Sequence, residues 1–429
     1  MTRVAVLVIL ILAAATDIAA AQLRGHGGPV RALAISPDGS EAVSGSFDTS
    51  AIRWSLRGNA AQQVLRFHDG AVDALLWLSD GRIVSSGEDA RIALWRPREQ
   101  KPSAVLAGHQ APVVALAVAP DGEWIASASR DRTARLWPLG RTGGPRVLEG
   151  HAQGVNGIAF SPDSGVLVTA GYDASLRIWP LRRADAPIVA MLPSPLNAVA
   201  VAPDGEIVTA GGDGKVYFLS EGGGRKGEIV AADAPIIALA LSRDGRLIAA
   251  AGIRGAVAII ERASRRIVRT LVGPGLPVWS VAFFPDDRTL LTGGADRIIR
   301  RWDTATGEPM GDVLAGGAAD PLSAFAGDPG AEVFRACVAC HTLRAGDGPR
   351  AGPTLAGLFG RRIATLPGYD FSDALRRLDI VWTPETVARL FELGPMTYTP
   401  GTKMPEQRIG SAEDRAALVK FLEKATNTP

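Results

Sequence analysis

Two thiols and an imidazole stand together at Cys337, Cys340 and His341, in the pattern C-x-x-C-H. Cysteines three residues apart on a helix lie on the same side of it, and the histidine that follows reaches the same space. Three kinds of chemistry use such a group: a redox disulfide, half of a zinc site, or two thioether bonds to a haem whose iron binds the histidine. The chain has two cysteines in total. Because a structural zinc needs a second pair of ligands, the pattern favours a covalent haem.

The remaining histidines and the net charge exclude other kinds of site. Four of the five histidines recur in one repeated context, at His26, His68, His109 and His151. The fifth is His341, so no histidine remains for a catalytic triad, a second haem or a His-based metal site. The formal net charge is +2 over 429 residues, which gives no reason to expect nucleic acid or an anionic membrane as partner.

Residues 1–21 are predicted to be a secretory signal peptide. Arg3 precedes an apolar run from Val4 to Ala15, which is shorter than the roughly 20 residues that span a bilayer. Ala19-Ala20-Ala21 is a small-residue cleavage site. Cleavage there predicts an exported, periplasmic protein of a bacterium with no membrane span, in the compartment where c-type haem is attached. The alternative is a signal that is retained as an anchor.

Residues 22–314 repeat one unit seven times. A tryptophan or its replacement recurs every 40 to 42 residues, at Trp54, Trp95, Trp137, Trp179, Leu219, Ile260 and Trp302. Each unit holds short alternating segments, such as 32–35, between tight turns that contain Asp and Gly. This pattern is typical of strands, and a period of this length indicates a repeat architecture.

The repeats resemble the WD-repeat β-propeller family over nearly all of residues 22–303. Four copies carry the family's tetrad of hydrogen-bonded side chains, at His26/Ser44/Asp48/Trp54, His68/Ser85/Asp89/Trp95, His109/Ser127/Asp131/Trp137 and His151/Thr169/Asp173/Trp179. The resemblance implies an all-β, seven-bladed propeller with structural histidines and a surface that binds a protein partner. The last three copies have lost part of the tetrad, so we expect that side of the ring to be less stable.

Two segments compete to supply the strand that closes the ring. One surrounds Leu23, and the other is 308–316, where Val313–Gly316 repeats the pattern of Val105–Gly108. Because signal cleavage would leave only about three residues for the N-terminal segment, we expect the C-terminal segment to close the ring. Residues 315–327 are rich in Gly, Ala, Pro and Asp, which predicts a short linker.

Residues 328–429 contain further motifs in a fixed order. Asp328-Pro329 predicts the start of a helix that runs into Cys337. The segments that follow are Gly352–Arg361, Gly368–Asp373, Trp382, Tyr398–Met404 and an amphipathic helix over about 412–425. Together with C-x-x-C-H, they resemble a mitochondrial-type class I cytochrome c, an all-α domain.

The resemblance implies one haem c, bound covalently through two thioethers. The residues implied at the haem are Cys337, Cys340, His341, Met404, Pro353, Arg361 and Trp382. By the resemblance, His341 and Met404 bind the iron, the Pro353 carbonyl orients His341, and Arg361 and Trp382 lie near a propionate. The alternative for Met404 is an ordinary core methionine.

Several positions depart from the pattern of that family. Phe371 and Phe391 replace tyrosines, which removes hydrogen bonds to a propionate and to the methionine sulfur. Met396 and Thr397 stand where many relatives carry docking lysines, and Lys403 remains. From residue 326 onwards, 13 Lys and Arg oppose 12 Asp and Glu, a charge of +1. We therefore expect no strongly basic docking face.

Two functions fit these features. The first is an electron-transfer protein that has a redox donor and a redox acceptor, and whose propeller docks partner proteins. The second is a propeller-based redox enzyme, peroxidase- or reductase-like, that the haem domain supplies with electrons. The histidine count leaves no axial ligand for a second haem in the propeller, which favours the first. The sequence names no catalytic residue, so whether the protein is an enzyme stays open.

Overall fold

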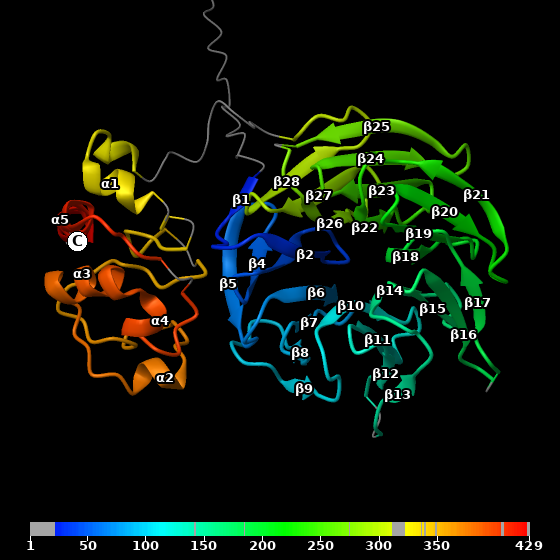
Figure 1. Ribbon diagram of the computed structural model, residues 1–429, viewed down its shortest axis with the longest axis horizontal. Coiled ribbons are helices and arrows are strands. Elements are labelled where there is room, and N and C mark those ends of the chain that lie inside the picture. Colours follow the sequence, from blue (N-terminus) through cyan, green and yellow to red (C-terminus); the bar gives the residue numbers. More distant parts are fainter. Residues whose placement is uncertain are drawn as a thin grey trace, which may run out of the picture.

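The computed structural model describes residues 22–140, 143–183, 185–273, 275–310, 322–335, 337–338, 340–347, 350–404 and 407–426. The predicted signal peptide and most of the predicted linker lie outside the described residues. The described chain forms a ring of seven four-stranded sheets with a helical domain beside it (Figure 1). Within the described ranges, no helix is long and apolar enough to cross a membrane.

Each blade of the ring is an antiparallel sheet, and in six of the seven the strands follow one another in chain order. Blades 1 to 3 comprise β2 (Val30–Ile35), β3 (Glu41–Ser46), β4 (Ser50–Ser55), β5 (Ala60–Arg66); β6 (Val72–Trp77), β7 (Ile83–Gly87), β8 (Ile92–Trp95), β9 (Ala104–Leu106); and β10 (Val113–Val118), β11 (Trp124–Ser129), β12 (Ala134–Pro138), β13 (Arg146–Leu148). The predicted seven-bladed propeller is therefore confirmed.

The remaining blades repeat this arrangement. Blades 4 to 7 comprise β14 (Val155–Phe160), β15 (Val166–Gly171), β16 (Ser175–Pro180), β17 (Ile188–Met191); β18 (Leu196–Val201), β19 (Ile207–Gly211), β20 (Lys215–Leu219), β21 (Arg225–Val230); β22 (Ile236–Leu241), β23 (Leu247–Gly252), β24 (Ala256–Glu261), β25 (Arg266–Val272); and β26 (Val278–Phe283), β27 (Thr289–Gly294), β28 (Ile298–Asp303) with β1 (Gln22–Arg24). The apolar side chains between neighbouring blades form the core, since the second strand of most blades is buried almost throughout.

The ring closes through its N-terminal strand. β1 pairs with β28 at Gln22↔Arg300, Leu23↔Ile299 and Arg24↔Ile298, and Leu23 is buried in the core. The expectation that the C-terminal segment closes the ring is therefore wrong. The described residues of that segment, 308–310, bond the far end of β28, where the Met310 amide donates to Arg301 O. Because β1 already occupies the hydrogen-bonding groups of residues 298–300, they are not free for a second strand. Residues 311–316 of the expected strand lie outside the described residues.

The four predicted tetrads are confirmed. In blade 3, His109 Nδ1 lies 2.7 Å from Asp131 Oδ2, and His109 Nε2 lies 2.8 Å from Ser127 Oγ. The Trp137 indole N–H donates to the same hydroxyl at 2.8 Å. The other three tetrads have the same partners. In each tetrad the Asp also accepts from the backbone N–H of the residue after the histidine. The tetrad thus fixes the loop that follows each histidine.

Blades 5 to 7 replace the missing tetrad groups in different ways. In blade 5, Tyr217 is fully buried and its hydroxyl donates to Asp213. In blade 7, the Trp302 indole still donates to Thr292 at 2.9 Å. Blade 6 packs through apolar side chains, including the fully buried Ile248 and Ile260. The lower stability expected for this side of the ring remains a prediction.

The C-terminal domain is built from short helices and loops. Its helices are α1 (Pro329–Phe334), α2 (Asp373–Arg376), α3 (Pro384–Leu393), α4 (Pro395–Tyr398) and α5 (Ala412–Thr426), preceded by a 3-10 helix, η1 (Ser323–Phe325). α1 crosses α5 closely, because a Cβ on Gly330 would lie 2.1 Å from Ala417 O. The Phe334 and Phe421 rings meet at this crossing, with centroids 5.4 Å apart. These contacts hold the first and last helices together.

Candidate haem site

The two cysteines lie in tight turns that follow α1. Asp328 caps that helix by accepting from Gly330 N at 2.9 Å, as the Asp-Pro pair predicts. The helix ends at Phe334 rather than running into the cysteines. The Cys337 amide instead bonds Phe334 O three residues back, and the Cys340 and His341 amides both bond Cys337 O. A bond across three residues keeps both thiols on one side of the turn.

Both cysteines are free thiols. Burial raises the pKa of the Cys337 thiol to about 11. Burial, with Asp48 of the propeller adding to it, raises the pKa of Cys340 to about 12. Such thiols are protonated at neutral pH and react slowly as nucleophiles. The described residues hold no group of three or more His, Cys, Asp or Glu that would bind a metal ion. The pair therefore does not form a disulfide in this structure, and the described residues offer it no partners for a zinc site.

The His341 ring is held in a cradle that admits only glycine. Its Nδ1–H donates to the Pro353 carbonyl at 2.8 Å, which leaves the lone pair of Nε2 for a metal. A Cβ on Gly352 would lie 2.5 Å from His341 Cε1 and 2.7 Å from Nδ1. Burial lowers the pKa of His341, although its bond to Pro353 opposes the shift. A neutral imidazole with a free Nε2 is the form that binds iron, so these residues fit a haem.

Met404 lies in the loop between α4 and α5. It is partly buried and packs against the core of the C-terminal domain. Its backbone amide donates a hydrogen bond to the Thr402 hydroxyl at 3.1 Å. Phe391, in α3, is buried in the same core. A thioether presented from a loop on the core suits a soft metal ligand.

A backbone hydrogen bond joins Arg361 and Trp382. The Trp382 amide donates to Arg361 O at 3.0 Å, and the Gly360 amide donates to Trp382 O at 2.9 Å. The guanidinium of Arg361 donates to the carbonyls of Ala356 and Thr354, and burial lowers the pKa of Arg361. The structure thus brings the backbones of Arg361 and Trp382 together, and the role of their side chains at a propionate stays a prediction.

The propeller supplies neighbours of the site that sequence reasoning missed. Arg66, at the end of β5, donates to the carbonyls of Arg350 and Ala351 at 2.6 and 2.7 Å. Its guanidinium carbon lies 4.0 Å from the centroid of the Tyr369 ring. Lys403 donates to His68 O and lies 3.6 Å from Asp69. No spacing rule links residues of different domains, so the sequence carries no signal for these contacts.

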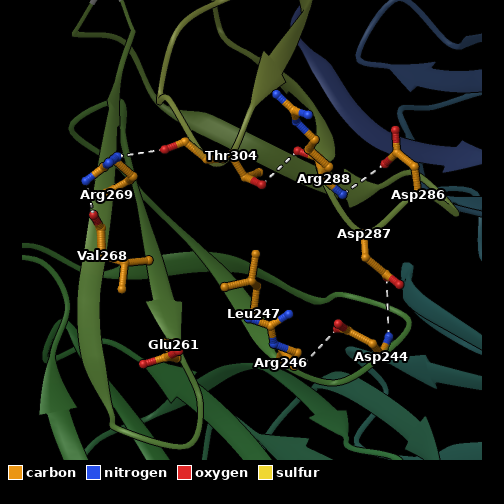
Figure 2. A pocket seen from close by; sticks show the side chains of 11 residues that line it. Asp244, Arg246, Leu247, Glu261, Val268, Arg269, Asp286, Asp287, Arg288 and Thr304 are labelled. Carbon is orange, nitrogen blue, oxygen red and sulfur yellow. Dashed lines mark hydrogen bonds between the residues drawn. The ribbon is translucent and has the colours of Figure 1, made fainter.

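A cavity lies in the propeller, between blades 6 and 7 (Figure 2). Its volume is about 580 Å³, and its walls are mostly charged. Several of those charges have partners: Arg288 pairs with Asp303 at 2.6 Å, and Asp287 accepts from Asp244 N. The lining contains no thiol or imidazole.

Comparison with known families agrees with the two-part architecture. The family described as WD domain, G-beta repeat matches residues 19–55, 60–96, 100–138, 145–180 and 265–303. These matches cover most strands of blades 1 to 4 and 7, together with β25 of blade 6. Blade 5 and the other strands of blade 6 are unmatched. The family described as Cytochrome c matches residues 327–426.

Three cytochromes c among the similar proteins each match about a quarter of this chain. A cytochrome c of Cochliobolus lunatus is 42% identical over 98 residues, which are 23% of this chain and 90% of the relative. A cytochrome c of Arabidopsis thaliana is also 42% identical over 98 residues, 23% of this chain and 87% of the relative. A cytochrome c type-1 of Ascaris suum is 39% identical over 105 residues, 24% of this chain and 90% of the relative.

Proposed function

Since the chain belongs to the cytochrome c family through its C-terminal domain and carries a WD-repeat propeller before it, we propose that it is an exported c-type cytochrome. In this proposal it carries single electrons through one haem c. Two thioethers, at Cys337 and Cys340, hold the haem, and His341 and Met404 ligate its iron. The bound haem supplies one-electron redox chemistry; the protein supplies attachment, orientation and burial.

The observation that carries this proposal is the cradle around His341. The Pro353 carbonyl holds the Nδ1 proton, so the ring keeps one tautomer and presents Nε2. The ring packs closely on Gly352, because a Cβ at that position would lie 2.5 Å from His341 Cε1. A fixed ligand keeps reorganisation small when the charge of the site changes by one electron. The crossing of α1 and α5 supports a class I topology for the domain.

The other site residues have supporting roles in the proposal. Arg361 and Trp382 would neutralise and hydrogen-bond a haem propionate, which is a buried anion that needs donors. Met404 would fill the sixth position of the iron. A filled sixth position leaves no place for peroxide or oxygen, which favours a carrier over a peroxidase-like enzyme. The propeller would dock a protein partner, and redox proteins would serve as donor and acceptor.

The first experiment measures the haem and the export signal together. The full chain is expressed with a periplasmic haem-attachment system, and the mature protein is weighed under denaturing conditions. We expect one haem adduct on a chain that starts at Gln22, after loss of residues 1–21. A mass without haem, or with two haems, contradicts the proposed cofactor; retention of the first residues contradicts cleavage.

The second experiment tests the sixth ligand. The ferric protein with Met404 bound should show the weak near-infrared band of sulfur-to-iron charge transfer, and Met404→Ala should lose it. Met396, which is 63% exposed, provides the matched control, since Met396→Ala should keep the band. A wild-type protein without the band that binds cyanide rapidly would support the peroxidase-like alternative instead.

A further inference from the structure

The haem domain lies against one sector of the propeller, at blades 1 and 2 (Figure 1). Several contacts between described residues join the two domains there. They involve Gly27, Arg66 and Asp69, all near the turns that the first two tetrads hold. The haem domain contributes Cys340, the backbone of 350–351 and Lys403. These are the surroundings of the attachment motif rather than a remote face of the domain.

One of these contacts is between Gly27 and Cys340. A Cβ on Gly27 would lie 1.9 Å from Cys340 Sγ, so only glycine allows this approach. The φ angle of Gly27 lies outside the left-handed region, which means that the backbone itself accepts any residue. Cys340 Sγ is the atom that carries the thioether in the proposed function. A loop that touches this sulfur therefore touches the periphery of the bound haem.

The repeat itself shows that Gly27 serves the contact and not the blade. Gly27 follows the tetrad histidine of blade 1, and its amide donates to Asp48 at 2.7 Å. The same position is Asp69 in blade 2, Gln110 in blade 3 and Ala152 in blade 4, each donating to its own tetrad Asp. Side chains at this position are thus compatible with the fold. Gln110 and Ala152 are exposed. On blade 1, Gly27 lies against Cys340 of the haem domain. On blade 2, the Asp69 side chain is also exposed, and it pairs with Lys403 of the haem domain.

Charge and backbone pairing complete the contact. Asp69 faces Lys403 at 3.6 Å, and Lys403 is the residue that remains of the family's docking lysines. Arg66 donates to two carbonyls, of Arg350 and Ala351, and the Ala351 amide donates to Gly25 O at 3.3 Å. The carbonyl of Ala351 also accepts from the Tyr369 hydroxyl at 2.8 Å. The propeller therefore contacts both Lys403 and the backbone of residues 350–351.

We infer that the propeller is an intramolecular partner of the haem domain, covering the Cys340 edge of the haem and limiting electron exchange with other redox proteins until the domains separate. The inference rests on the proposed function and names a regulation of that site. This inference also explains why the haem domain has a charge of only +1 and no strongly basic face. A tethered partner is present at high effective concentration and needs little long-range electrostatic attraction.

The test compares Gly27→Gln with Ala152→Gln. The second variant introduces the same side chain at the equivalent position of a blade that does not face the haem domain. Two quantities are measured on the full chain. One is hydrogen exchange of the backbone amides at 350–352. The other is the second-order rate at which the reduced protein passes one electron to hexacyanoferrate(III), which becomes hexacyanoferrate(II).

Gly27→Gln should speed both hydrogen exchange at 350–352 and oxidation by hexacyanoferrate(III). The oxidation rate should rise by roughly tenfold or more. A tenfold change corresponds to about 1.4 kcal/mol of lost stability of the docked state. Ala152→Gln should change neither. Arg66→Gln, which removes the bonds to the two carbonyls, should act in the same direction if Gly27→Gln fails to fold. Unchanged exchange, or faster exchange with an unchanged oxidation rate, overturns the inference. A chain that binds no haem contradicts the proposed function instead, and the exchange measurement can still be made on it.

Discussion

Gly352→Ala tests the cradle of His341 with the addition of a single methyl group. The new Cβ would lie 2.5 Å from His341 Cε1, 2.7 Å from Nδ1 and 2.9 Å from Cys340 O. Ordinary carbon contacts are about 3.5–4.0 Å, so the ring must move by about 1 Å. Gly352 has no left-handed φ, which means that the strain comes from crowding and not from the backbone.

The expected cost has two parts. Overpacking of a tight site costs typically about 1–3 kcal/mol. A ring displaced by about 1 Å also weakens the bond from Nδ1 to Pro353 O, now 2.8 Å, and a hydrogen bond contributes about 0.5–1.5 kcal/mol. The haem domain should therefore lose roughly 2–4 kcal/mol of its free energy of unfolding.

The assay is guanidinium unfolding of the full haem-loaded chain, followed by circular dichroism of the haem absorption band. This signal reports the haem domain alone, which matters because a two-domain chain does not unfold in one step. Gly346→Ala is the matched control, since a Cβ there meets nothing within 4 Å and the glycine has no left-handed φ. Equal midpoints for Gly352→Ala and wild type, or equal losses for the two variants, would refute the cradle.

Two further predictions concern the rest of the chain. Burial lowers the pKa of His109 in the folded protein. As the pH drops below about 6.5, the unfolded chain therefore binds a proton at this histidine that the folded protein does not, and the free energy of unfolding of the wild type decreases. The His109→Gln variant has no group that titrates at this position. Urea unfolding at pH 8 and pH 5.5 should therefore show a smaller difference in the free energy of unfolding between wild type and variant at the lower pH. A difference that stays constant contradicts a buried, neutral histidine in the tetrad. Gly330→Ala should lower haem-domain stability by about 1–3 kcal/mol, since its Cβ would lie 2.1 Å from Ala417 O; Gly410→Ala, in open space, should not, and a thermal melt compares them.

Much of the local structure was predictable because it depends on short-range spacing. The distance from Ser127 to Asp131 and on to Trp137 places three side chains of one hairpin together, so the blade-3 tetrad follows from the sequence. Asp328-Pro329 likewise predicts the start of α1, because capping involves neighbouring residues. Tight turn bonds end that helix at Phe334, and spacing alone does not reveal where a helix gives way to such turns.

Ring closure and the domain contact depended on tertiary structure. Both the segment at Leu23 and the one that begins at 308 have strand-like patterns, and their competition for one edge of β28 is decided by which of them packs into the core. Leu23 does so, being only 2% exposed. Gly27 looks like any loop glycine in the sequence, and only the fold brings Cys340 against it, 313 positions along the chain (340 − 27). Periodicity specifies each element from its own residues, whereas contacts between distant segments depend on the summed geometry of everything that lies between them.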